Sequence, residues 1–435
     1  MSSLRLLTLG ALAAIVVFGT TYRIGGLFLY PRAMMALYAL WVLWREPRLR
    51  GLLKPLAGLL MIGVFALASA FGADEWRQLP IFLQLVVRGV ALPYLAAIGL
   101  ARLMGLTDRG DGPRTLTTHQ SIQIVCLALV AQCAVSVAHL ALPAFRTVYL
   151  EWVNLADTWR ELAALGLPRF SGIGGISIYD TAIAYCVLGA ALLLSAPRTS
   201  ADMWLRALAV AIIMALCMLH GRTGMVFAAV LLGILAWQDV LNRRHQPGSV
   251  ALRVGAGLGL LGVLAFVFVD EELRSYVLEF SGELFINLFA GDGLRSDSTD
   301  DFVENHLHLP DWETVLGGSG LWAQPDVAEA IGASYTTDSG YLLLLNFGGV
   351  PMVIVCVLAL TWLLRGYVRS LQALGEPPPP DQVPARRWAP VAFYAYLATV
   401  IALVSWKGPI FLSEHCMTAL FLVLTIGSRR GRSRC

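Results

Sequence analysis

The chain has 435 residues, of which 57% are hydrophobic and only 14% are charged, and its mean hydropathy is +0.68. Because water-soluble proteins carry about 25% charged residues, this composition excludes an ordinary soluble domain. The formal net charge of +3 is small for a chain of this length, and no nucleic-acid partner is expected.

Long apolar runs repeat along the sequence, as is typical of helices that cross a membrane. Helices are expected because backbone groups in lipid must form hydrogen bonds within their own segment, and no alternating strand pattern of about ten residues is present. The first run has no small-residue cleavage site, so we interpret it as a retained span. We predict an all-α polytopic membrane protein with about 12 transmembrane helices, at residues 4–20, 25–44, 55–72, 81–104, 121–142, 179–196, 205–220, 222–237, 253–269, 339–364, 389–405 and 415–427.

The basic residues predict the orientation of these spans. With the N-terminus inside, 21 Lys and Arg residues fall in inner segments and nine in outer ones, as the positive-inside rule requires. Both termini are then cytoplasmic, and a large acidic loop faces the periplasm. The expected divisions are N-terminal helices 1–142, periplasmic loop 143–178, central helices 179–269, large periplasmic loop 270–338 and C-terminal helices 339–435.

The first outer loop contains a candidate amphipathic helix over 146–165. It suits a helix lying on the membrane surface or, equally, a connector packed on the spans. The seven cysteines form no CxxC pair and no Cys/His cluster, so neither a disulfide framework nor a metal site is expected.

Arginines within spans are costly and usually functional. Arg32 and Arg88 both lie about seven residues, or ~10 Å, from the outer ends of their predicted spans. They could line one cavity that opens outward. Alternatively, each could extend its side chain to the interface or pair with a backbone carbonyl. Arg169, Arg222 and Arg295 lie in outer segments, where guanidinium groups suit phosphate oxygens; salt bridges to the acidic loop are the alternative.

Asp338 precedes a hydrophobic span and could act as a general base, although Asp is also a preferred helix cap. Glu304 and His306 are rival bases in the same acidic loop. Trp322 and Tyr341 could stack on sugar rings, and aromatic residues are also common at membrane interfaces.

Three short motifs suggest a family. They are Arg169-Phe170-Ser171-Gly172 before a span, Gly221-Arg222-Thr223-Gly224 at a tight turn, and Thr337-Asp338-Ser339-Gly340-Tyr341-Leu342 followed by Phe347-Gly348-Gly349. Together with the late outer loop, they resemble the Wzy-type polymerases of O-antigen and exopolysaccharide and the related O-antigen ligases. The resemblance covers roughly residues 165–365.

The resemblance implies a metal-independent, GT-C-like glycosyltransferase of the bacterial inner membrane that needs no cofactor. Such an enzyme transfers a growing glycan from undecaprenyl pyrophosphate to a lipid-linked repeat unit at the periplasmic face, with a chain-length regulator as a further partner. The arginines and the two aromatic residues would bind substrate, and Asp338, Glu304 or His306 would activate the acceptor hydroxyl.

Two alternatives stay open. One is a ligase that transfers glycan to the lipid A core, although the ligases carry a His-Asn pair where this chain has Asp338-Ser339. The other is a transporter or flippase of lipid-linked sugars. A transporter would be expected to carry intramembrane charges in both halves of the bilayer, whereas the span arginines here lie near the outer side.

Overall fold

A computed structural model describes most of the chain. The described stretches are residues 3–71, 78–107, 116–155, 157–165, 171–176, 178–194, 200–242, 307–322, 337–374 and 388–428, with a few pieces of one to three residues between them.

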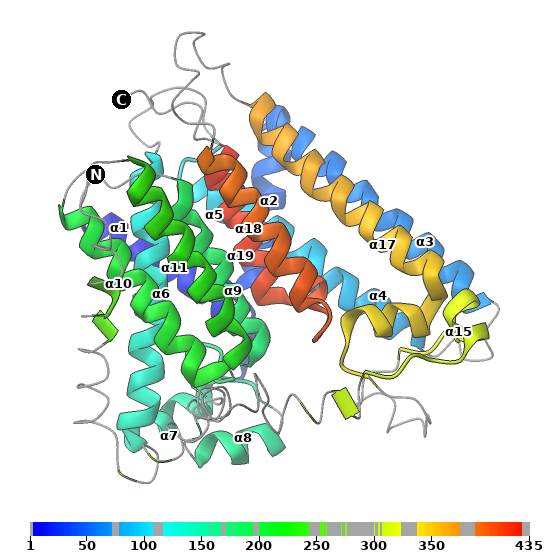
Figure 1. Ribbon diagram of the computed structural model, residues 1–435, viewed down its shortest axis with the longest axis horizontal. Helices are drawn as coiled ribbons and strands as arrows, with labels where there is room; N and C mark the ends of the chain where they lie inside the picture. The colour runs from blue at the N-terminus through cyan, green and yellow to red at the C-terminus, as the bar shows by residue number, and fades with distance from the viewer. Residues whose placement is uncertain are drawn as a thin grey trace.

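The described part is a bundle of apolar helices (Figure 1). Five helical segments are long and apolar enough to cross a membrane: Pro47–Ala70, Leu79–Leu103, Thr118–Ala141, Met203–His220 and Gly340–Ala373. Five shorter apolar helices accompany them: Ser3–Phe18, Tyr179–Leu194, Thr223–Gln238, Pro390–Val404 and Glu414–Ser428. The prediction of a helical, multi-pass membrane protein is therefore confirmed, whereas the number of spans stays a prediction. Most of the predicted span 253–269 lies outside the described residues.

The elements follow in chain order: α1 Ser3–Phe18, β1 Tyr22–Ile24, β2 Leu27–Leu29, α2 Pro31–Arg45, η1 Pro47–Leu56, α3 Ala57–Phe71, α4 Leu79–Val86, η3 Val87–Ala91, α5 Leu92–Leu103, α6 Thr118–Ala141, α7 Pro143–Trp152, α8 Asp157–Ala164, α9 Tyr179–Gly189, η5 Ala190–Leu194, α10 Ser200–His220, α11 Arg222–Asn242, α15 Trp312–Gly317, α17 Gly340–Ala373, α18 Trp388–Val404, η8 Ile410–Leu412 and α19 Glu414–Ser428.

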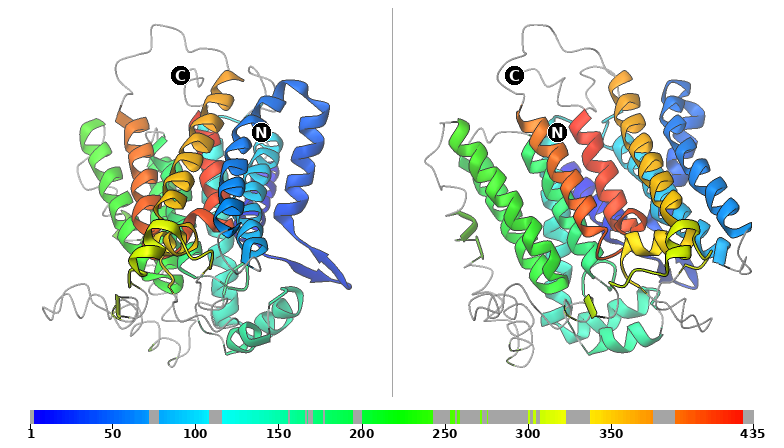
Figure 2. Two further views of the ribbon diagram at one scale, coloured as in Figure 1. Left: turned by 90° about the vertical axis from the view of Figure 1, so that its right-hand side faces the viewer. Right: turned by 45° about the vertical axis from the view of Figure 1, so that its right-hand side comes forward.

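Helices α9 and α19 pack together in the interior, and α5 packs against α19 from another side. Helix α1 lies against α6, α2 against α5, and α17 against α3. The β-hairpin, α7, α8 and α15 all lie at one end of the bundle, which we call the loop end (Figure 2). Helix α1 begins, and α19 finishes, at the opposite end.

The second predicted span, 25–44, is wrong at its start. Residues 22–29 form an antiparallel hairpin, and the helix begins only at Pro31. The turn is Gly25-Gly26, with φ of 57° and 82°. Two consecutive residues with positive φ form the turn that suits a two-residue hairpin, and glycine adopts this conformation without steric cost.

The predicted helix 146–165 is two helices, α7 and α8, and not one. Between them, Val153 adopts an extended conformation and forms a β-bridge with Tyr22 of the hairpin. Its side chain is fully buried. Burial of this residue against the hairpin outweighs continuation of the helix.

Helix α17 is broken at Gly348 and Gly349, whose backbone angles are not helical. A break in a helix leaves carbonyl groups that lack donors within the helix. Ser319 N–H donates to the carbonyl of Asn346 at 2.7 Å, and Gly320 N–H donates to that of Phe347 at 2.9 Å. The segment after α15 thus completes the backbone hydrogen bonds of the broken helix.

Helix α15 is fixed by its own first turn. Asp311 accepts hydrogen bonds from the backbone N–H and the hydroxyl of Thr314, at 3.0 Å and 2.7 Å. These bonds hold the pKa of the Asp311 carboxyl below its usual value. The cap therefore weakens when acid protonates Asp311.

Gly349→Ala is expected to lower the free energy of unfolding by more than about 1 kcal/mol. Gly349 has φ of 68°, and an added Cβ would lie 2.6 Å from the carbonyl oxygen of Leu316. Gly233→Ala in α11 is the control, because nothing lies within 4 Å of its added Cβ. Thermal unfolding in detergent compares the two variants, and equal midpoints would contradict the proposed constraint.

Candidate functional site

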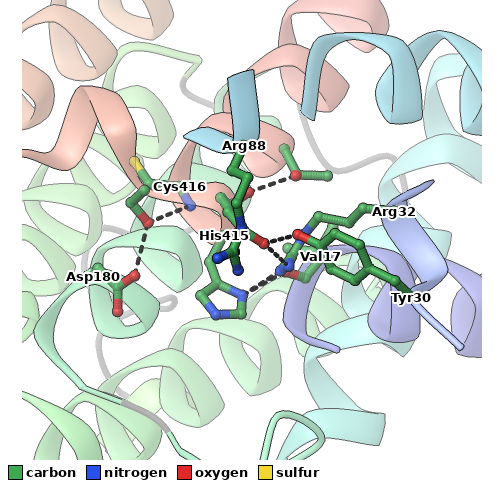
Figure 3. A network of polar contacts seen from close by, with 10 residues as sticks. Val17, Tyr30, Arg32, Arg88, Asp180, His415 and Cys416 are labelled. Carbon is green, nitrogen blue, oxygen red and sulfur yellow. Dashed lines mark hydrogen bonds and ion pairs between the residues drawn. The ribbon is translucent and has the colours of Figure 1, made fainter. Parts of the chain in front are cut away.

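The carboxylate of Glu414 contacts three side chains from distant parts of the chain, and Figure 3 labels these three as Tyr30, Arg32 and Arg88. Arg32 Nη1 lies 2.7 Å from Oε2, and Arg88 Nη2 lies 2.8 Å from Oε1. The hydroxyl of Tyr30 also donates to Oε2. We call these residues, together with His415, the Glu414 cluster.

Arg32 is the buried member, with only 1% of its side chain exposed. Its Nη2 donates to the carbonyl oxygen of Val17 at 2.6 Å and lies 2.5 Å from Nδ1 of His415. Val17 belongs to the last turn of α1, where carbonyls lack partners within the helix. The cation therefore satisfies a helix C-terminus as well as Glu414.

Two helix dipoles favour this ion pair. The negative end of α1 faces Arg32 through Val17, and Glu414 is the first residue of α19, whose positive end stabilises an anion. Each charge thus lies at the helix end of opposite sign. These two contacts offset part of the cost of placing charges among apolar helices.

Arg88 reaches Glu414 from a π-helical turn, η3, between α4 and α5. Such turns insert one extra residue into a helix and are frequent at functional sites. Gly89 allows the turn to approach the α18–α19 connection (residues 405–413), since an added Cβ would lie only 2.1 Å from the carbonyl oxygen of Leu412. In contrast to Arg32, Arg88 keeps 53% of its side chain exposed.

Helix lengths place the cluster inside the apolar layer. Helices α1 and α19 connect the opposite end of the bundle to the cluster with 16 and 15 residues, or ~24 Å and ~22 Å of helix. The hydrocarbon core of a bilayer is ~30 Å thick. With the far ends of both helices at one membrane boundary, the cluster lies nearer the other boundary, on the loop-end side.

Asp180 lies in the first turn of α9 and contacts the residue next to the Glu414 cluster. Its Oδ2 accepts from the hydroxyl of Ser413 at 2.8 Å, and its Oδ1 accepts from the backbone N–H of Thr181 at 2.6 Å. Asp180 therefore ties the start of α9 to the residue that precedes Glu414.

Asp338 lies across the same connection, just before α17 begins at Gly340. It is half-buried and close enough to Tyr179 to act on it electrostatically. The side chain of Tyr179 in turn packs directly on Gly408. Asp338 and the Glu414 cluster thus border the α18–α19 connection from different elements.

The other predicted arginines are placed only in part. Arg222 is the first residue of α11, and its side chain is not among those described. Arg169 and Arg295 lie outside the described residues, as does His306. Glu304 is exposed.

Both predicted aromatic residues are in packing contacts. Trp322 is fully buried, with its ring centroid 5.3 Å from that of Phe82 and 6.3 Å from that of Phe347. The hydroxyl of Tyr341 donates to the carbonyl oxygen of Ala402 at 2.9 Å, and its ring meets Trp406 edge-on.

Tyr341 and Trp406 also line an open hollow of about 400 Å³ between α17 and α18. Val350, Val353, Ile354 and Leu403 contribute to its walls. This lining suits hydrocarbon better than sugar.

Glu414 and His415 were not predicted from the sequence. Glu414 directly precedes the last apolar run, in the stretch Ser413-Glu414-His415, and resembles an ordinary acidic residue in a first helical turn. A signal was nevertheless present, because two arginines within spans require an anionic partner.

No protein-family model, curated protein or solved structure matches the chain.

Glu414→Gln is expected to destabilise the protein by about 3–5 kcal/mol, because it leaves the buried guanidinium of Arg32 without a counter-ion. The double variant Arg32→Met with Glu414→Gln removes both charges and should recover most of that loss. Thermal unfolding in detergent measures both effects. A double variant no more stable than Glu414→Gln alone would contradict the ion-pair account.

Proposed function

We propose that this protein is a polysaccharide polymerase of the bacterial inner membrane. It transfers a growing glycan from undecaprenyl pyrophosphate to a lipid-linked repeat unit at the periplasmic face. The observation that carries the proposal is the half-exposed side chain of Arg88, whose guanidinium is held beside Glu414 near the loop-end boundary of the apolar layer. A lipid diphosphate presents its anion at that depth.

The charge balance of the cluster supports an anionic ligand. Arg32 and Arg88 share one carboxylate, so these three side chains together carry one net positive charge. Arg32 is enclosed, and Arg88 retains open surface. A guanidinium forms paired, charge-assisted hydrogen bonds with phosphate oxygens, and these bonds are stronger where water is scarce.

The orientation follows from the basic residues. Segments predicted to be inner carry 21 Lys and Arg, against nine in the outer ones, which assigns the loop end to the periplasm. Nucleotide sugars are cytoplasmic, so a glycosyl transfer at this end uses a donor that is already activated. A lipid-linked diphosphate meets that requirement.

The proposed reaction is a single displacement at the anomeric carbon of the donor. The acceptor hydroxyl oxygen forms the new bond to that carbon, and the bond from the carbon to the phosphate oxygen breaks. The electron pair leaves with the diphosphate, whose negative charge therefore increases. Arg88 stabilises this charge as it develops, which is the form of electrostatic assistance that accelerates the step.

Asp338 is the proposed acceptor of the hydroxyl proton. It is half-buried at the start of α17 and lies near Tyr179, on the α17 side of the α18–α19 connection. A carboxylate placed there would orient the hydroxyl and take its proton as the bond forms. Glu304 and His306 remain alternatives for this role.

Arg88→Met should abolish chain lengthening while leaving folding intact, because Glu414 keeps Arg32 as its partner. Arg102→Met is the matched control: Arg102 lies at the other end of the same continuous helix and pairs with Glu46 at 2.6 Å. Membranes containing each variant are supplied with lipid-linked repeat units, and product length is read on gels. Normal chain lengths with Arg88→Met would contradict the assignment.

The reaction itself is tested by reconstituting the purified protein with undecaprenyl-pyrophosphate-linked repeat units alone. A ladder of longer lipid-linked glycans is expected. Transfer only after addition of lipid A core would favour a ligase. Movement of the lipid-linked sugar across the bilayer without lengthening would favour a flippase.

A further inference from the structure

His415 follows Glu414 at the start of α19 and has two differently placed ring nitrogens. In Figure 3, one nitrogen faces Arg32 and Val17, and the other points away from them. The first is Nδ1, which lies 2.5 Å from Arg32 Nη2 and 2.8 Å from the carbonyl oxygen of Val17.

The charge on Arg32 determines which nitrogen carries the proton. A guanidinium is always protonated and only donates hydrogen bonds. An Nδ1–H would direct a donor dipole at that cation from 2.5 Å, whereas an unprotonated Nδ1 accepts from it. An Nδ1–H could instead donate to the Val17 carbonyl at 2.8 Å, but that carbonyl already accepts from Arg32 Nη2 at 2.6 Å, and the interaction of Nδ1 with the full charge of Arg32 is stronger. The neutral ring therefore carries its proton on Nε2.

Nε2 of His415 can contact a ligand. Within the described part of the chain it makes no hydrogen bond. It is also not among the fully enclosed polar atoms that lack a partner, so part of its surface is accessible. The ring is part-buried, on the residue next to the carboxylate that holds Arg88. The cluster thus combines a cationic donor, Arg88 on η3, with a neutral donor, His415 at the start of α19.

We propose that His415 donates a hydrogen bond from Nε2–H to a phosphate oxygen of the ligand that Arg88 binds. This inference rests on the proposed function, because it assumes a lipid diphosphate as that ligand. His415 then contributes to binding and supplies no base, since its only unprotonated nitrogen faces Arg32. Arg32 is a positioning residue that fixes the tautomer.

Two substitutions separate the two nitrogens. Gln places an amide N–H near the position of Nε2, and Asn places its amide near Nδ1. His415→Asn can still offer Arg32 an acceptor but has no donor toward the ligand. His415→Gln keeps the ligand-side donor.

The binding experiment uses the full-length protein in detergent and undecaprenyl pyrophosphate as the probe, with intrinsic tryptophan fluorescence as the readout. His415→Asn should weaken binding about tenfold or more, the loss expected for one hydrogen bond to a charged group. His415→Gln should stay within about threefold of the wild type. Equal affinity of the wild type and His415→Asn, or equal losses in both variants, would overturn the inference.

Competition measurements identify the source of the phosphate, and an unfolding measurement distinguishes a loss of binding from a folding defect. Inorganic pyrophosphate should compete only weakly, and vesicles of phosphatidylglycerol should not compete; strong competition by vesicles would assign the site to ordinary lipid headgroups. Failure of the wild type to bind undecaprenyl pyrophosphate would reject the proposed function itself. Thermal unfolding checks that each variant is folded.

The tautomer is tested independently of binding. The protein is labelled with ¹⁵N-histidine, and the imidazole protons are assigned by comparison with His415→Gln. The signal of His415 should show a proton on Nε2. A proton on Nδ1 would overturn the inference even if both variants lost affinity.

Discussion

The structure depends on one ion pair inside the apolar layer. Two charges in such surroundings lose several kcal/mol of hydration each, and they persist only where geometry and further hydrogen bonds compensate. Here Arg32 joins the end of α1 to the start of α19, and both helix dipoles favour the charges they meet. The pair therefore fixes how α2 meets α19 across 382 residues of sequence, and the bond from Arg32 to Val17 adds the end of α1.

Arg32 and Arg88 differ in exposure, and we assign them different roles on that basis. Arg32 is enclosed, so its charge is committed to Glu414, Val17 and His415. Arg88 is half-exposed on a π-helical turn that Gly89 allows to lie against Leu412. Glu414 holds the Arg88 side chain in place with Nη2 at 2.8 Å, which under the proposed function would reduce the side-chain entropy lost when a ligand binds. The carboxylate of Glu414 thus serves both as the counter-ion of Arg32 and as the group that positions Arg88.

The sequence predicted the helices well because apolar runs in a membrane protein have few alternatives to helix. It also grouped Arg32 with Arg88, and both contact the same carboxylate, but Arg32 lies in the first turn of α2 and not seven residues inside a helix, because α2 begins only at Pro31. The sequence analysis missed Glu414 because no local pattern distinguishes an acidic residue that pairs with buried arginines from an ordinary acidic residue in the first turn of a helix. The hairpin at Gly25-Gly26 and the break in α17 were missed for a related reason: each is completed by a distant segment, Val153 in one case and Ser319 with Gly320 in the other.

Asp338 and Arg88 have different neighbours beside the α18–α19 connection. Asp338 is beside Tyr179, and Arg88 is paired with Glu414. A carboxylate that is paired with a guanidinium has a lowered pKa and is a weaker proton acceptor, so under the proposed chemistry the carboxylate that holds Arg88 does not supply the base. Gly408 packs against Tyr179, and Gly89 packs against Leu412, so both elements can approach this connection closely. Under the proposed function, this connection would be the backbone against which a proton acceptor and a cation are both placed.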